Sequence, residues 1–139
     1  MVRLKPIIAV LLLVIGAVPA AWAQAGSCPP PTKPMLRVEL YFGRDIGGRL
    51  GVSERQWGRF LAREITPRFP DGLTVLDARG QWRDPARHAL VREPSKLVVI
   101  VAPDDAATRR RLAEIAAAYK KRFSQKSIGL VLSTVCAAF

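Results

Sequence analysis

The pattern of apolar and polar positions along the chain predicts four strands and two helices. Apolar and polar residues alternate over 36–43, which is typical of a strand with one buried face. Three further segments rich in strand-forming residues follow, at 73–82, 90–102 and 128–135. A short polar stretch separates the segments 73–82 and 90–102, so we expect these two strands to form a long hairpin.

Two helices are predicted between these strands. Ser53 and Gln56 form a capping-box pattern at the start of the first helix. The apolar residues that follow recur at the spacing of one buried stripe, and they are Trp57, Phe60, Leu61 and Ile65. Asp104 and Asp105 suit the positive end of the second helix. The apolar stripe of that helix consists of Leu112, Ile115, Ala116, Tyr119 and Phe123.

The resulting element order is β-α-β-β-α-β, which predicts an α+β fold. We expect a ferredoxin-like, four-stranded antiparallel sheet with two helices on one face, formed by a single domain over 36–139. In this arrangement the strands lie in the spatial order fourth, first, third, second. A hairpin turn around 86–87 is expected to bring Gly80 opposite Pro94 and to produce a bulge, because both residues disturb a regular ladder.

The first residues of the chain have the three zones of a signal peptide. Arg3 and Lys5 precede an uncharged apolar run at 7–18, and Ala21-Trp22-Ala23 supplies the small-x-small cleavage pattern. The apolar run is too short to span a bilayer as a helix. We therefore expect residues 1–23 to be removed, and the exported protein to have no membrane span. A Pro-rich leader at 24–35 would then precede the domain in the periplasm or outside the cell.

The chain has two cysteines, Cys28 and Cys136. An even count in an oxidising compartment predicts a disulfide, and the predicted topology places the end of the last strand beside the leader. Two alternatives remain open. Cys28 is a candidate for lipidation, although the preceding residues lack the usual leucine. The last four residues match a prenylation box, although prenyl transfer requires a cytosolic chain.

The charge of the protein is strongly positive, with 22 Lys and Arg residues against 11 Asp and Glu residues and a formal net charge of +11. Such a domain favours anionic neighbours. We expect no specific nucleic-acid binding, because the aromatic residues that alternate with basic ones in nucleic-acid readers are missing. We expect no metal site and no cofactor, since His88 is the only histidine and no cofactor motif occurs.

Polar residues on the first two strands form the main candidate site. Alternation places Arg37, Glu39 and Tyr41 on one face of the first strand. If Leu76 and Ala78 of the second strand point to the helices, two more charged residues share that open face. They are Asp77 and Arg79. These groups suit an acid–base site or a polar ligand, while the alternative is a solvated sheet face with charge ladders.

The residues near the hairpin tip extend this candidate site. Trp82 beside Gln81 is suited to stacking on a sugar ring or a base. Alternatively, Trp82 covers the core at the base of the hairpin. We assign no catalytic residue, because no nucleophile motif is present.

Several motifs resemble those of domain-of-unknown-function family 3574, a group of small exported bacterial proteins. The motifs are the segment 69–75, then Asp77, then Gly80-Gln81-Trp82, then Arg92-Glu93 before Ser95-Lys96, and finally Tyr119-Lys120-x-Arg122-Phe123. The resemblance covers nearly the whole predicted domain. It supports the fold and the compartment, and it implies no activity, cofactor or substrate.

Two functions from different classes fit the sequence. The first is a binding or interaction module of the cell envelope, which uses the open sheet face for a small polar ligand, an envelope component or a second copy of the chain. The second is a small hydrolase or isomerase that uses the carboxylates of this face and Tyr41. The first interpretation is favoured, because no sequence motif supports catalysis.

Overall fold

The computed structural model describes residues 27–86 and 88–139, so the predicted signal peptide lies outside the described residues. Four long strands form one antiparallel sheet, and they are β1 (Lys33–Gly43), β4 (Thr74–Asp84), β5 (Ala89–Ala102) and β6 (Gly129–Ala137). Their order in the sheet is β4-β5-β1-β6. The predicted α+β class is confirmed.

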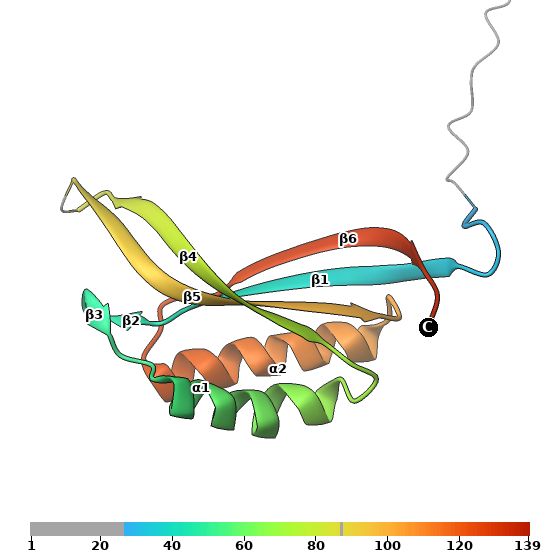
Figure 1. Ribbon diagram of the computed structural model, residues 1–139, viewed down its shortest axis with the longest axis horizontal. Coiled ribbons are helices and arrows are strands. Elements are labelled where there is room, and N and C mark those ends of the chain that lie inside the picture. The colour runs from blue at the N-terminus through green and yellow to red at the C-terminus, as the bar shows by residue number, and fades with distance from the viewer. Residues whose placement is uncertain (1–26, 87) are drawn as a thin grey trace, which may run out of the picture.

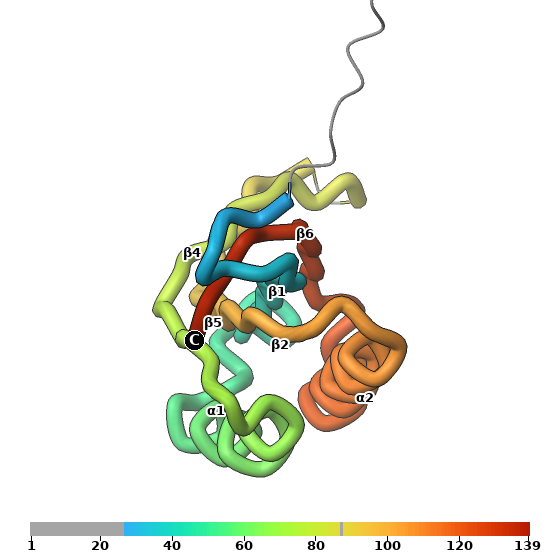
Figure 2. The backbone as a smooth tube through the Cα atoms, turned by 90° about the vertical axis from the view of Figure 1, so that its right-hand side faces the viewer, coloured from blue at the N-terminus to red at the C-terminus, as the bar shows by residue number. Residues whose placement is uncertain are grey.

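Two helices cover one face of this sheet (Figure 1, Figure 2). The first, α1 (Glu54–Phe60), continues through a π-helical turn at Leu61–Ile65 into a short 3₁₀ segment at Thr66–Arg68. The second helix is α2 (Ala106–Phe123). Between β1 and α1 lies a ribbon of two short strands, β2 (Asp45–Ile46) and β3 (Arg49–Leu50), which the sequence pattern did not predict.

The first helix begins as the sequence predicted. The backbone N–H of Gln56 donates to the Ser53 hydroxyl oxygen at 3.3 Å. The Ser53 backbone N–H donates in return to the Gln56 side-chain oxygen at 2.9 Å. These two hydrogen bonds satisfy backbone donors that the first turn leaves without a partner.

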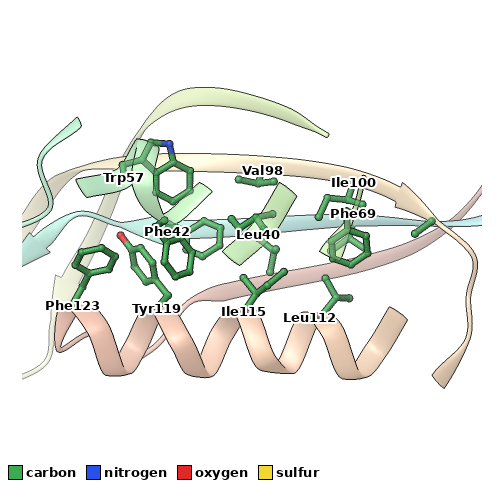
Figure 3. Packing of buried hydrophobic residues seen from close by; sticks show 14 of the residues in the cluster. Leu40, Phe42, Trp57, Phe69, Val98, Ile100, Leu112, Ile115, Tyr119 and Phe123 are labelled. Carbon is green, nitrogen blue, oxygen red and sulfur yellow. The ribbon is translucent and has the colours of Figure 1, made fainter. Parts of the chain in front are cut away.

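The core lies between the sheet and the two helices, and the apolar face of β1 and the main stripe residues of both helices enter it as predicted (Figure 3). Val52 and Phe69 add to it from outside the predicted stripes. An aromatic cluster fills one end, where the Phe42 ring lies 5.1 Å from the Trp57 ring and 4.7 Å from the Tyr119 ring, measured between centroids. The Tyr119 hydroxyl donates to the backbone oxygen of Gly43 at 2.8 Å. This bond satisfies the polar end of a ring buried by its aromatic neighbours.

The predicted bulge in the hairpin is wrong. Arg79 pairs with Pro94 and Gly80 with Glu93, and the pairing continues without interruption from Thr74 to Asp84. The Pro94 carbonyl oxygen accepts from the backbone N–H of Arg44, beyond the end of β1. Since the N and O of one residue in a strand point to the same side, the missing proline donor faces away from β4. The ladder with β4 therefore loses no hydrogen bond.

The predicted disulfide is confirmed, with a Cα–Cα distance of 5.4 Å between Cys28 and Cys136. Pro34 of β1 pairs with Cys136 of β6, which brings the leader to the last strand. The sulfur atoms of both cysteines are therefore bonded to each other. Neither cysteine keeps the free thiol that lipidation or prenylation requires. Within residues 27–86 and 88–139, no helix has the length and apolar character that crossing a membrane requires.

Candidate functional site

The predicted site residues lie on two opposite faces of the sheet. Lys96 pairs with Asp77 on one side and with Phe42 on the other. Directly paired residues share a face, and Phe42 is buried beneath the helices, so Asp77 lies on the helix side. Arg79 follows two residues later and shares that face. The expectation that these two residues share the open face with Glu39 is therefore wrong.

On the open face, Arg37, Glu39 and Tyr41 of β1 form one hydrogen-bonded group. The Tyr41 hydroxyl donates to one Glu39 carboxylate oxygen at 2.6 Å, and an Arg37 NH2 group lies 2.9 Å from the other. The bond from Tyr41, followed by the effect of Arg37, holds the pKa of Glu39 below its usual value. The same bond raises the pKa of Tyr41. At neutral pH the carboxylate is charged and the phenol keeps its proton.

On the helix side, four charged residues from different elements form an ion cluster, which we define as Arg44, Glu54, Asp77 and Lys96. Lys96 Nζ lies 2.9 Å from a Glu54 carboxylate oxygen and also contacts the Asp77 carboxylate. Arg44 contacts the same Glu54, and its Nε donates to the backbone oxygen of Val52 at 2.9 Å. The Lys96 and Arg44 side chains are only 6% and 7% exposed, whereas both carboxylates face solvent.

The charges in this cluster stabilise one another. Hydrogen bonds from Lys96 are the largest cause that lowers the pKa of Glu54 and of Asp77. Burial is the largest single effect on the pKa of Lys96 and lowers it, but the hydrogen bonds and the charge attraction from the two carboxylates together raise the pKa above its usual value. Glu54, Asp77 and Lys96 are therefore ionised at neutral pH.

A cleft of about 650 Å³ adjoins this cluster, and we call it the hairpin cleft. Arg92 lines it and donates from Nε to the Gln81 side-chain oxygen at 2.9 Å. Arg79 also lines the cleft. Within the described part of the chain, its guanidinium makes no hydrogen bond or ion pair. The other lining residues are Arg44, Asp77, Ala78, Gly80, Glu93, Pro94 and Ser95.

A second cleft, of about 480 Å³, lies between the hairpin, the β2–β3 ribbon and the segment after α2, and we call it the loop cleft. Trp82 lines it and is 47% exposed. Gln125 closes one wall by donating from Nε2 to the backbone oxygen of Asp45 at 2.7 Å. Glu93 also lines the loop cleft, and burial raises the pKa of its carboxyl despite a hydrogen bond from the Asp45 backbone.

Three of the predicted site residues, Asp77, Arg79 and Gln81, thus line the hairpin cleft, and Trp82 lines the loop cleft. The open-face group of Arg37, Glu39 and Tyr41 lines neither. Sequence reasoning missed Lys96 as a member of a site. The available signal was its position, because Lys96 shares the alternation of Val98 and Ile100, which are core residues. A lysine on a core face requires carboxylate partners.

A family model described as "Protein of unknown function (DUF3574)" matches residues 37–139. The chain belongs to this family. Membership confirms the resemblance seen in the sequence and assigns no activity to the DUF3574 domain. No curated protein is found to match the sequence.

Two solved structures are similar to this DUF3574 domain. A phage SAM lyase in complex with S-methyl-5′-thioadenosine superposes with a TM-score of 0.58 at 12% identity, covering 74% of this chain and 90% of the lyase. The apo state of a phage SAM lyase gives a TM-score of 0.55 at 12% identity, covering 76% and 92%. At this identity the likeness concerns the fold alone.

Proposed function

We propose that this domain binds a small anionic ligand, such as a carboxylate or a phosphate compound, in the hairpin cleft. The observation that carries the proposal is the guanidinium of Arg79, which lines the cleft without an ion-pair partner among the described residues. A guanidinium presents a planar fork of donors that matches carboxylate and phosphate oxygens. The binding residues from the sequence would then be Arg79 and Gln81, while Asp77 would hold Lys96 at the edge of the cleft.

The balance of charge around the cleft supports an anion. Lys96 neutralises Asp77, and Arg44 is paired with Glu54. Arg79 and Arg92 then remain, opposed by Glu93, whose pKa is raised by burial. An anion between the two guanidinium groups would find hydrogen-bond donors already held in place by the Gln81 contact of Arg92.

We also propose that the domain works outside the cytoplasm, in the cell envelope or beyond it. The Cys28–Cys136 bond supports this, because disulfides persist in oxidising compartments. The signal-peptide pattern at 1–23 supports it independently. The intact mass of the exported protein tests the proposal, since a mass that includes residues 1–23 would contradict cleavage.

The pKa values of Glu39 and Tyr41 on the open face favour binding over the hydrolase or isomerase alternative. With a lowered pKa, Glu39 is a weak base, and with a raised pKa, Tyr41 is a weak acid. The carboxylate of Asp77, which that alternative also requires, lies on the other side of the sheet.

The test combines mass spectrometry of small molecules that copurify with the protein and titration calorimetry with phosphate, citrate and S-methyl-5′-thioadenosine. We expect an anion to bind and the Arg79→Ala variant to weaken it at least about tenfold, the scale of a charge-assisted hydrogen bond. The matched control is Arg63→Ala, which removes the same charge from an exposed position near the end of the first helix. Equal affinity of wild type and Arg79→Ala would contradict the proposal, as would binding of the uncharged nucleoside alone.

A further inference from the structure

Both helices lie on the same side of the sheet, so no helix covers its open face (Figure 2). The centre of this open face is apolar. Leu76, Leu97 and Tyr41 form one cross-strand row over β4, β5 and β1. The next row includes Val99 and Val131 on either side of Glu39. Leu76, Tyr41 and Val131 are 46%, 39% and 50% exposed. Contiguous exposed apolar surface of this kind marks an interaction site.

Charge on this face is balanced, in contrast to the rest of the protein. Arg37 and Glu39 are the charged residues of its central rows, and they compensate each other. Much of the positive charge lies on the helix layer instead, where Arg55, Arg59 and Arg63 recur at helical spacing and 109–111 is an arginine run. Two copies can therefore approach through their open faces with their basic helices directed outward, without the repulsion that a net charge of +11 imposes elsewhere.

We propose that this face binds a second copy of the chain in a two-fold symmetric dimer. A two-fold axis that lies between the two sheets and crosses over position 38 of β1, perpendicular to the strand, would set Arg37 of each copy against Glu39 of the other. A two-fold interface requires such a self-complementary surface, because the same patch serves both subunits. The face provides the complementary charges two residues apart on one strand, and it provides apolar residues on both sides of them.

Sedimentation velocity over a concentration series tests this proposal. We expect the wild-type protein to sediment as a dimer and Leu76→Lys or Val131→Lys to sediment as a monomer. The matched control is Leu50→Lys, which adds the same charge at an apolar residue that is 57% exposed on the β2–β3 ribbon. Circular dichroism checks that each variant folds, and two variants on different strands guard against the failure of one.

A charge exchange tests the predicted axis. Arg37→Glu and Glu39→Arg should each abolish the dimer, because like charges then face one another across the axis. A mixture of the two variants should form a heterodimer, since one copy then carries two carboxylates and the other two guanidinium groups at the same positions. A wild-type monomer at every concentration would overturn the proposal, and so would a dimer that none of these substitutions affects.

Discussion

The Nζ atom of Lys96 on β5 lies 2.9 Å from a carboxylate oxygen of Glu54 in the first turn of α1. The two residues are 42 positions apart in the sequence. Since Lys96 also contacts Asp77 on β4, one ammonium group holds the start of the helix against two strands. Two other members of the ion cluster, Arg44 and Asp77, line the hairpin cleft. The stability of the fold and the shape of the cleft therefore depend partly on the same cluster.

The ion cluster predicts sensitivity to acid. The folded-state pKa values of Glu54 and Asp77 lie below their usual 4.5 and 3.8. The stability from these groups is present above those usual values and is lost as the pH falls through the lowered folded values. We expect the fall in unfolding free energy between about pH 6 and about pH 3 to be smaller in Lys96→Met than in wild type.

Urea unfolding at several pH values measures this difference. Arg109→Met is the matched control, because Arg109 contacts Asp104 in an exposed pair that ties no strand to a helix. Its acid dependence should equal that of wild type. An identical fall in Lys96→Met and wild type would contradict the role given to the cluster.

The buried aromatic cluster predicts a large effect of removing Trp57. Its side chain is 3% exposed and packs against Phe42 and Phe60. Trp57→Ala should cost about 3–5 kcal/mol of unfolding free energy, through lost contacts and the cavity that remains. Trp82→Ala is the control at a half-exposed ring, and it should cost less than about 1 kcal/mol. Similar losses in both variants, measured by denaturant unfolding, would show that the cluster is not the core.

Removal of the charge of Glu93 is predicted to stabilise the folded protein. Because burial raises its folded-state pKa above the usual 4.5, the stability it contributes is present below that value and is lost as the pH rises through the folded pKa. The charged form therefore destabilises the fold at neutral pH. Glu93→Gln should unfold at a higher temperature than wild type near pH 7, and the difference should shrink in acid. The matched control is Asp71→Asn, which removes a carboxylate from an exposed turn before β4 and should leave the melting temperature unchanged. A melting temperature of Glu93→Gln below that of wild type at neutral pH would refute the prediction.

The disulfide predicts a loss of stability without a change of fold. Cys28 and Cys136 are 108 positions apart, and the loop-entropy model gives about 4–5 kcal/mol for a closure of this length. Cys28→Ser and Cys136→Ser should therefore melt at similar temperatures, both below wild type, with unchanged far-ultraviolet circular dichroism. A thiol count on denatured, unreduced protein provides the independent measurement. Two free thiols in protein taken from the envelope would contradict the bond.

The sequence was sufficient to predict the elements whose pattern is strong. Residues 36–43 and both helical stripes have one clear apolar face, so their burial follows from periodicity alone. The sequence could not predict which face of β4 is buried. Val75 and Leu76 are both apolar and, as neighbours in a strand, point to opposite faces, so either could belong to the core. Val75 packs against the core and Leu76 is left on the open face.

Other features of the site were beyond local patterns for physical reasons. Strands β2 and β3 have two residues each, which is too short for any periodicity. The partners of Lys96 come from a helix and a strand that only the tertiary fold brings together. Alternation along a strand indicates that two residues share a face, but it does not indicate which distant carboxylate lies opposite a lysine.

The position of β1 has a consequence for how the protein is made. This first long strand lies between β5 and β6, and Lys33 near its start pairs with Ala137 near the end of the chain. Its neighbours on both edges are therefore synthesised after it, and the second edge stays open until β6 has been made. An apolar strand with open edges is prone to aggregate. The incomplete chain consequently carries an exposed site for aggregation along β1, which closes only when β6 pairs with it.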